Sequence, residues 1–113
     1  MPQLSREFND LLVQSIDETI TDLLSRAVVD ALYAHLQTVY SVPKDEVPNR
    51  LDTLLTALEK VFGASSQTIT RAIARKFYLK LGLEFTNHPS YTLIEYVDEA
   101  KMKLRTSSSS NLG

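Results

Sequence analysis

Apolar residues recur at intervals of three and four along most of the chain, and this period constrains its fold more than any other feature. Near the N-terminus the pattern forms one stripe through Leu4, Phe8, Leu11, Leu12, Ile16, Ile20 and Leu23. Only three glycines and four prolines interrupt the 113 residues. The sequence therefore predicts long amphipathic helices rather than the many turns of a small β-protein.

Serines and prolines mark the expected boundaries in the first half of the chain. Ser5 is a predicted N-cap for the first helix. Ser25 offers a second N-cap, which predicts a bend near residue 24 and a second helix ending at about Tyr40. A continuous helix through Ser25 is the alternative. Two prolines make residues 41–49 a predicted loop with one helical turn.

Glycines mark the ends of the next two helices. The third helix is predicted from Arg50 to Gly63, which is placed as a glycine that ends a helix. Ser65 or Ser66 then caps a fourth helix, which stops at Gly82. The short connection predicts a helical hairpin.

The last part of the chain contains a connection, a helix and a tail. Residues 83–90 form the connection, and Thr92 with Glu95 three residues later is a capping-box pattern that opens the fifth helix. Residues 106–113 are rich in serine and predicted to be disordered. The prediction is thus an all-α, compact bundle of about five helices, with helices 3 and 4 as a short-turn hairpin, in a single domain of residues 1–105.

The amino-acid composition argues against several classes of function. The chain has no cysteine, so disulfides and thiolate chemistry are excluded. Its net charge is −2, which argues against a nucleic-acid footprint over the whole protein but leaves a local basic face open. The longest apolar runs are too short for a membrane span or a signal peptide. We therefore expect a cytoplasmic protein without membrane contact.

Groups suited to catalysis or metal binding are scattered. His35 and His88 are isolated, and both are predicted to be structural, His88 in a turn before Pro89. The carboxylates of the first helix fall between its apolar positions, as on a solvated face, at Glu7, Asp10, Asp17, Glu18 and Asp22. We expect no enzyme, cofactor, metal site or small-molecule substrate.

Residues 62–71, FGASSQTITR, resemble the turn and second-helix start of a helix-turn-helix. In this interpretation Gly63 is left-handed, a serine caps the next helix, and Ile69 holds the two helices together. The segment that follows is basic, with no acid between Ser66 and Leu81. The candidate DNA contacts are Ser66, Gln67, Thr70 and Arg71 at base edges, and Arg75, Lys76 and Lys80 at the phosphate backbone.

An ordinary helical hairpin is the competing interpretation of the same residues. The helix-turn-helix family has a small residue four positions before the turn glycine, whereas this chain has Glu59. The basic face of the fourth helix would then balance the acidic first helix.

A second resemblance covers roughly residues 8–104. It rests on the succession ALYAHL (31–36), VPKDEVP (42–48), LLTALEKVFG (54–63), FYLKLGLEF (77–85) and YVDEAK (96–101). This succession resembles the small archaeal Nitrosopumilus output-domain family of helical proteins. The resemblance implies a signal-output or interaction domain and carries over no catalytic residue. The turn at residues 65–68 departs from it and keeps DNA binding as an alternative.

The predicted function is a non-enzymatic protein-interaction or signal-output module in archaeal signalling or regulation, which associates with itself or binds a protein partner. Leu11, Leu12 and Val13 are consecutive and cannot all face one core. The candidate interface on the first helix is therefore Phe8, Leu12 and Val13. The alternative is a DNA-binding regulator that uses the fourth helix.

Overall fold

The computed structural model describes the backbone of residues 2–112 and the side chains of residues 6–105. Within these residues the chain is helical and has no strand, which confirms the predicted all-α bundle. The α-helices are α1 (Pro2–Leu23), α2 (Arg26–Tyr40), α3 (Leu51–Phe62), α4 (Ser66–Leu81) and α5 (Leu93–Leu112). Two short 3-10 helices, η1 (Lys44–Asn49) and η2 (Gly63–Ser65), precede α3 and α4.

Ser25 separates α1 from α2 as predicted. Its backbone is extended, and its hydroxyl accepts a hydrogen bond from the Val28 N–H at 3.2 Å. This N-cap satisfies a donor that the new helix leaves open. The continuous-helix alternative is therefore wrong. Ser5 is not the N-cap of α1, because the helix already begins at Pro2.

The hairpin connection differs in detail from the prediction. Gly63 has φ 58° and ψ −133°, a positive φ but not the left-handed helical conformation. Ser65 makes no side-chain cap bond, because the 3-10 turn η2 leads directly into α4 and the Ser66 N–H donates to backbone carbonyls of that turn. Gly82, by contrast, ends α4 as predicted, and it does so in the left-handed conformation with φ 72° and ψ 25°.

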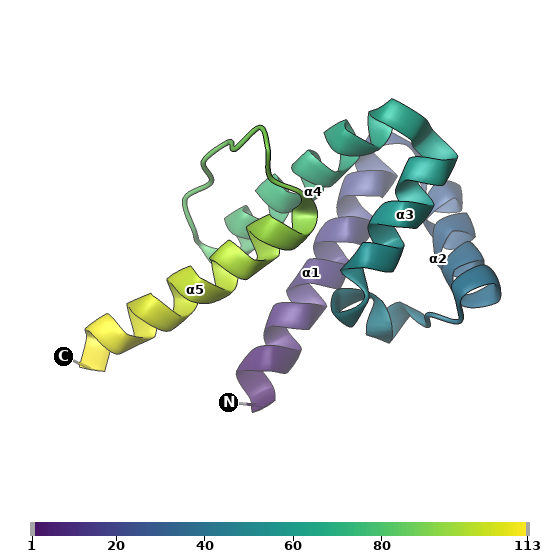
Figure 1. Cartoon of the computed structure of the whole chain (residues 1–113). Coiled ribbons are helices and arrows are strands. Elements are labelled where there is room, and N and C mark those ends of the chain that lie inside the picture. Colours follow the sequence, from purple (N-terminus) through teal and green to yellow (C-terminus); the bar gives the residue numbers. More distant parts are fainter. Residues whose placement is uncertain (1, 113) are drawn as a thin grey trace.

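The helix α1 lies between the other elements. In Figure 1 it runs through the middle of the molecule, with α5 on one side and α2 and α3 on the other. Its most extensive packing is against α4. At this contact the rings of Phe8 and Phe77 meet edge to face, with centroids 4.9 Å apart. Further fully buried side chains continue the core along both helices, at Leu12, Ile16, Ile20, Ile73 and Ala74.

The start of α5 forms one half of the predicted capping box. The Thr92 N–H donates to Glu95 Oε1 at 2.9 Å, so the glutamate reaches back to the residue before the helix. The backbone of α5 is helical to Leu112, whereas the side chains of residues 106–113 lie outside the described residues. The predicted disorder of that segment stays a prediction. None of the helices, over the described residues, is long and apolar enough to cross a membrane.

Candidate functional site

The lysines of α4 are paired with carboxylates of α1. Lys76 Nζ lies 3.0 Å from Asp22 Oδ2 and 3.8 Å from Glu18 Oε1, and Lys80 Nζ lies 3.1 Å from the same Glu18 oxygen. The acidic first helix thus balances part of the basic face, as the hairpin interpretation predicts. These two lysines, both candidate phosphate contacts, are already in ion pairs within the chain.

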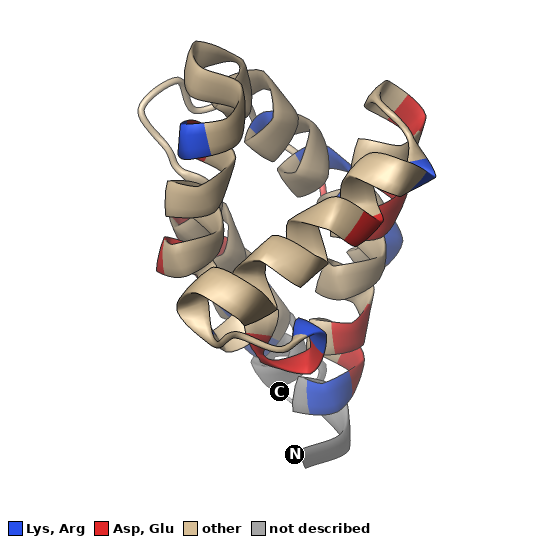
Figure 2. Cartoon of the chain, turned by 90° about the vertical axis from the view of Figure 1, so that its right-hand side faces the viewer, with Lys and Arg blue, Asp and Glu red and all other residues tan. Residues whose placement is uncertain are grey.

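The two arginines of α4 are in different surroundings. The Arg75 guanidinium lies over the Phe85 ring, 5.6 Å from its centroid. Neither Arg71 nor Arg75 forms an ion pair with the side chains of residues 6–105. On the face in Figure 2, basic and acidic residues are interspersed along the ribbons rather than gathered by sign.

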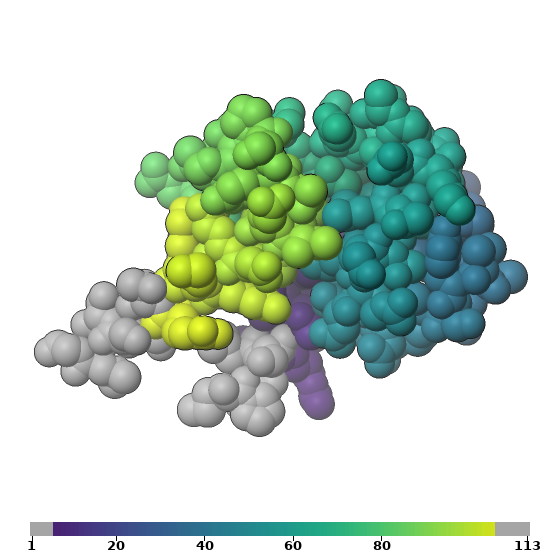
Figure 3. Space-filling model, viewed as in Figure 1, coloured from purple at the N-terminus to yellow at the C-terminus, as the bar shows by residue number. Residues whose placement is uncertain are grey.

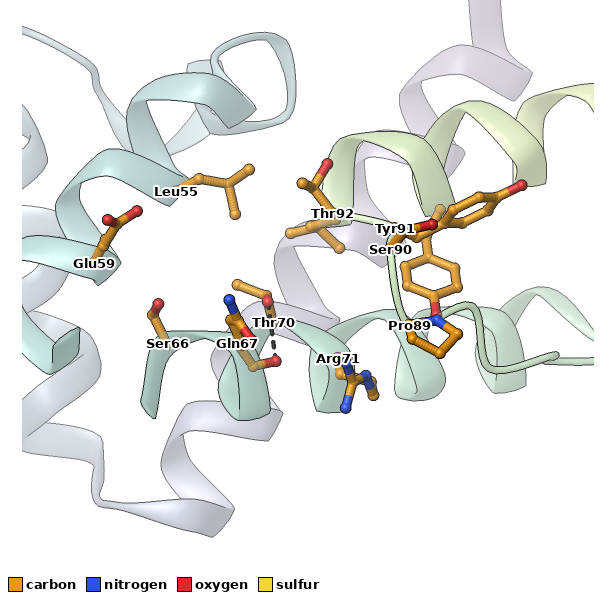
Figure 4. Close-up of a pocket in the computed structure, with 12 residues that line it drawn as sticks. Leu55, Glu59, Ser66, Gln67, Thr70, Arg71, Pro89, Ser90, Tyr91 and Thr92 are labelled. Carbon is orange, nitrogen blue, oxygen red and sulfur yellow. Dashed lines mark hydrogen bonds between the residues drawn. The ribbon is translucent and has the colours of Figure 1, made fainter. Parts of the chain in front are cut away.

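Four of the predicted DNA contacts line a groove, which we call the α3–α4 groove (Figure 4). Helix α3 contributes Leu55 and Glu59 to it, and the opposite wall is formed by residues 89–93 together with Tyr96. Between them α4 contributes Ser66, Gln67, Thr70 and Arg71. In the space-filling view the loop and the first turns of α5, in green, lie directly beside α3, in teal (Figure 3). The cavity has a volume of about 200 Å³.

The groove combines apolar and polar groups. Leu55 is half-buried and Leu93 is buried. Ser66 is only 8% exposed, and its hydroxyl makes no hydrogen bond with the described side chains or backbone. Gln67 is exposed, and Thr70 Oγ1 donates to the Gln67 carbonyl at 3.2 Å. These groups leave donors and acceptors available to a ligand that enters the groove.

Tyr96 fastens the loop that forms the far wall. Its hydroxyl accepts from the His88 N–H at 2.8 Å and lies 3.1 Å from the His88 carbonyl, to which it donates. The His88 ring stacks on Tyr91 with centroids 4.2 Å apart. The Tyr91 N–H also donates to the His88 carbonyl, so His88 begins a turn as predicted. The wall is therefore held by specific contacts to α5.

Tyr78 links α4 to α5 beneath this wall. Its hydroxyl lies 2.6 Å from the Tyr96 carbonyl and 2.7 Å from Glu99 Oε2, and Glu99 Oε1 lies 3.7 Å from His88 Nε2. Burial, and then the hydrogen bond to Glu99, raise the pKa of the Tyr78 phenol well above its usual range. The phenol is therefore held neutral as a donor.

A similar tyrosine joins α1, α2 and η1 on the other side of the molecule. The Tyr33 hydroxyl donates to Asp17 Oδ1 at 2.6 Å, and Lys44 Nζ lies 3.1 Å from Asp17 Oδ2. Burial, and then the Asp17 hydrogen bond, raise the pKa of the Tyr33 phenol well above its usual range. His35, on the same helix, is half-buried beside Tyr40, in agreement with its predicted structural role.

The predicted interface on α1 is wrong for two of its three residues. Phe8 is 6% exposed and Leu12 is fully buried, because α4 packs on this side of α1. Val13 is half-buried at the edge of a shallow hollow with Lys44. Of the three consecutive apolar residues, Leu12 thus lies in the core, and Leu11 and Val13 beside it are half-buried.

Among the described residues, no three His, Asp or Glu side chains lie together in a group that could hold a metal ion. The groove contains hydroxyl, amide, guanidinium and carboxylate groups beside apolar side chains. Such a set suits recognition of a polar chain through hydrogen bonds and ion pairs.

Sequence patterns did not predict the far wall of the groove. Pro89 and Thr92 were recognised as turn and cap residues, but their approach to α3 is a contact between distant parts of the chain. Periodicity does not report such contacts.

No protein-family model matches the chain, and no curated protein or solved structure matches it.

Proposed function

We propose that this chain is a non-enzymatic protein-interaction module of the signal-output type, and that the α3–α4 groove is its docking surface. The observation that carries the proposal is the size and lining of the groove. Its volume of about 200 Å³ is below the roughly 300–1,000 Å³ of sites for drug-sized molecules. It is suited to one anchoring side chain and adjoining backbone of a partner.

The lining supports the same use. Leu55 and Tyr91 give the groove apolar surface, but polar groups from α4 and Thr92 make up the larger part of its lining. A mixed lining of this kind suits a partner segment that brings one apolar side chain together with hydrogen-bonding groups. The resemblance to the archaeal output-domain family implies a role in signalling, and the proposal adopts that role.

Filling the groove tests this proposal. Gln67 is exposed and lines the groove, whereas its neighbour Thr68 is exposed and does not line it. Short random peptides displayed on phage would be selected against the wild type, and their affinities measured by fluorescence anisotropy. We expect Gln67→Trp to weaken binding by about tenfold or more, equivalent to ~1.4 kcal/mol, because the indole occupies the space of the anchor.

The matched control is Thr68→Trp, which places the same side chain on the same helix outside the groove. It should bind the selected peptides as the wild type does, and circular dichroism should show equal helicity for both variants. Peptides that bind all three proteins equally would place the docking surface elsewhere and refute the proposal.

DNA binding through α4 is the second candidate. It is favoured by Arg71 and Arg75, which have no acidic partner among the described residues, and by the exposure of Gln67. Two observations weigh against it: Lys76 and Lys80 are paired with α1, and Glu59 shares the groove with the predicted base contacts.

Salt dependence separates this candidate from the first. A labelled random-sequence duplex would be titrated at low and near-physiological salt with the wild type and an Arg71→Ala/Arg75→Ala double variant. A DNA-binding protein would bind in a salt-sensitive way that the double variant loses. Absence of binding at low salt would remove this candidate.

A further inference from the structure

Two opposite charges lie toward opposite ends of the α3–α4 groove. In Figure 4 the Glu59 carboxylate from α3 is at one end, and Arg71 lies beyond Gln67 and Thr70 toward the other. Neither side chain forms an ion pair within residues 6–105. We infer that the occupant is an extended segment of another protein that carries an acidic residue for Arg71 and a basic residue for Glu59. The inference rests on the proposed function of the groove.

Arg71 is the stronger of the two determinants. It is half-buried, whereas Arg75 one turn later is exposed and lies over Phe85. A guanidinium in a partly enclosed site binds a carboxylate through two parallel hydrogen bonds, and partial removal of water strengthens the attraction. The lysines farther along α4 already have Glu18 and Asp22 as partners. Arg71 is therefore the charge on this helix best placed for an acidic side chain of the occupant.

The middle of the groove suits the backbone of an extended segment. Such a segment carries N–H and C=O groups that need partners once they leave water. The Ser66 hydroxyl is available for this purpose, because the residue borders the groove and the hydroxyl has no described partner. The Gln67 amide offers both a donor and an acceptor beside it. Leu55 and Tyr91 then contact the apolar side chain between the two charged residues.

Glu59 decides between a peptide and a nucleic acid. A phosphate backbone would gain from Arg71 but would be repelled by the exposed carboxylate in the same groove. A peptide can place a lysine or arginine at that end. The pair of charges also fixes the direction in which the segment lies, because the reversed segment would bring like charges together.

Charge reversal in the intact chain tests the inference. Peptides selected against the wild type should carry Asp or Glu at one end of the binding motif and Lys or Arg at the other. Arg71→Glu should weaken them by about tenfold or more. Selections against an Arg71→Glu/Glu59→Lys double variant should return motifs with the charges exchanged. Arg75→Glu is the matched control, because it reverses a charge on the same helix outside the groove and should leave the motif unchanged.

The outcomes distinguish failure of the inference from failure of the docking site. Peptides that Gln67→Trp blocks but that bind the Arg71→Glu variant as tightly as wild type would overturn the charge pairing and leave the docking groove intact. Peptides that Gln67→Trp does not block, or no bound peptides at all, would overturn both proposals. A groove that binds the random duplex but no peptide would assign it to nucleic acid instead.

Discussion

The two sides of α4 carry cations in contrasting surroundings. On the side that faces α1, Lys76 and Lys80 lie 3.0 and 3.1 Å from carboxylates of that helix. On the side that faces the groove, Arg71 has no acidic partner within the described side chains. The same run of basic residues is thus partly neutralised along one side and available along the other.

This contrast shows why the charge of a helix cannot be interpreted without its neighbour. The sequence shows four basic residues and no acid between Ser66 and Leu81, which indicates a surface for phosphates. In the structure, α1 supplies Glu18 and Asp22 to two of the four. The basic residues that remain for a partner are two arginines, and one of them shares its groove with Glu59.

The largest loss of stability is expected when a core side chain of α4 is removed, because both sides of the helix depend on its packing. Phe77 is fully buried and packs against Phe8. We expect Phe77→Ala to lower the free energy of unfolding by about 3–5 kcal/mol, because it leaves a cavity between α1 and α4. Guanidinium denaturation followed by circular dichroism measures this loss.

Leu79→Ala on the same helix is the control, since Leu79 is 76% exposed. Its effect should stay within about 0.5 kcal/mol, as is usual for exposed positions. Equal losses for the two variants would contradict the packing of α4 described above.

Local signals were sufficient to predict most of the fold. The three- and four-residue spacing identified the helices because each buries one stripe. Ser25 marked a boundary through its capping hydroxyl, and Gly82 marked one through its left-handed backbone. Gly63 ends α3 as predicted and has a positive φ, but it does not adopt the predicted left-handed helical conformation, because a 3-10 turn follows it directly. That turn is set by how α3 and α4 pack, which a single residue does not report.

The candidate site was predicted only in part. Gln67, Thr70 and Arg71 were named from the resemblance of the turn to a helix-turn-helix, and they do lie together. Their neighbours from residues 89–93 come eighteen or more positions later, and no spacing rule connects them. The interface prediction at Phe8 and Leu12 failed because a stripe of consecutive apolar residues does not show which of them the next helix covers.

A smaller loss of stability is expected from a substitution at the contact between α4 and the wall of the groove. Tyr78→Phe removes the hydroxyl that lies between Glu99 and the Tyr96 carbonyl. We expect a loss of about 1–3 kcal/mol in the free energy of unfolding, because the hydrogen bond from the hydroxyl to the Glu99 carboxylate is lost. Peptide binding in the groove should weaken as well, since Tyr96 fastens the loop at His88. A variant with unchanged stability and binding would show that the wall does not depend on this contact.

High pH should lower the stability of the folded protein through two tyrosines, Tyr78 at this contact and Tyr33 on α2. Both Tyr78 and Tyr33 have a raised pKa in the folded protein, so the folded state holds their protons more tightly than the unfolded state. Their contribution is therefore complete below the ordinary tyrosine pKa of about 10 and is lost as the pH rises above it. The slope is up to about 1.4 kcal/mol per pH unit for each group.

Urea denaturation at a series of alkaline pH values measures this slope. The Tyr33→Phe/Tyr78→Phe double variant should show a shallower fall above pH ~10, because it lacks both phenols. Parallel curves for the wild type and the variant would show that these tyrosines do not govern alkaline stability.

The smallest expected effect distinguishes the two sides of α4 directly. Lys76→Gln removes the ion pairs with Asp22 and Glu18, which are partly exposed, so the free energy of unfolding should fall by only about 0.2–1 kcal/mol. The loss should shrink in high salt, which screens exposed charges. Arg71→Gln removes no pair among the described residues and should leave stability within about 0.5 kcal/mol of wild type while weakening the groove-bound peptides. Urea denaturation at low and high salt, beside peptide anisotropy, measures both quantities.

Arg71→Gln could instead lower stability as much as Lys76→Gln does, and with the same dependence on salt. That result would mean that Arg71 also pairs with an acidic group within the chain, and the distinction between the two sides would fail.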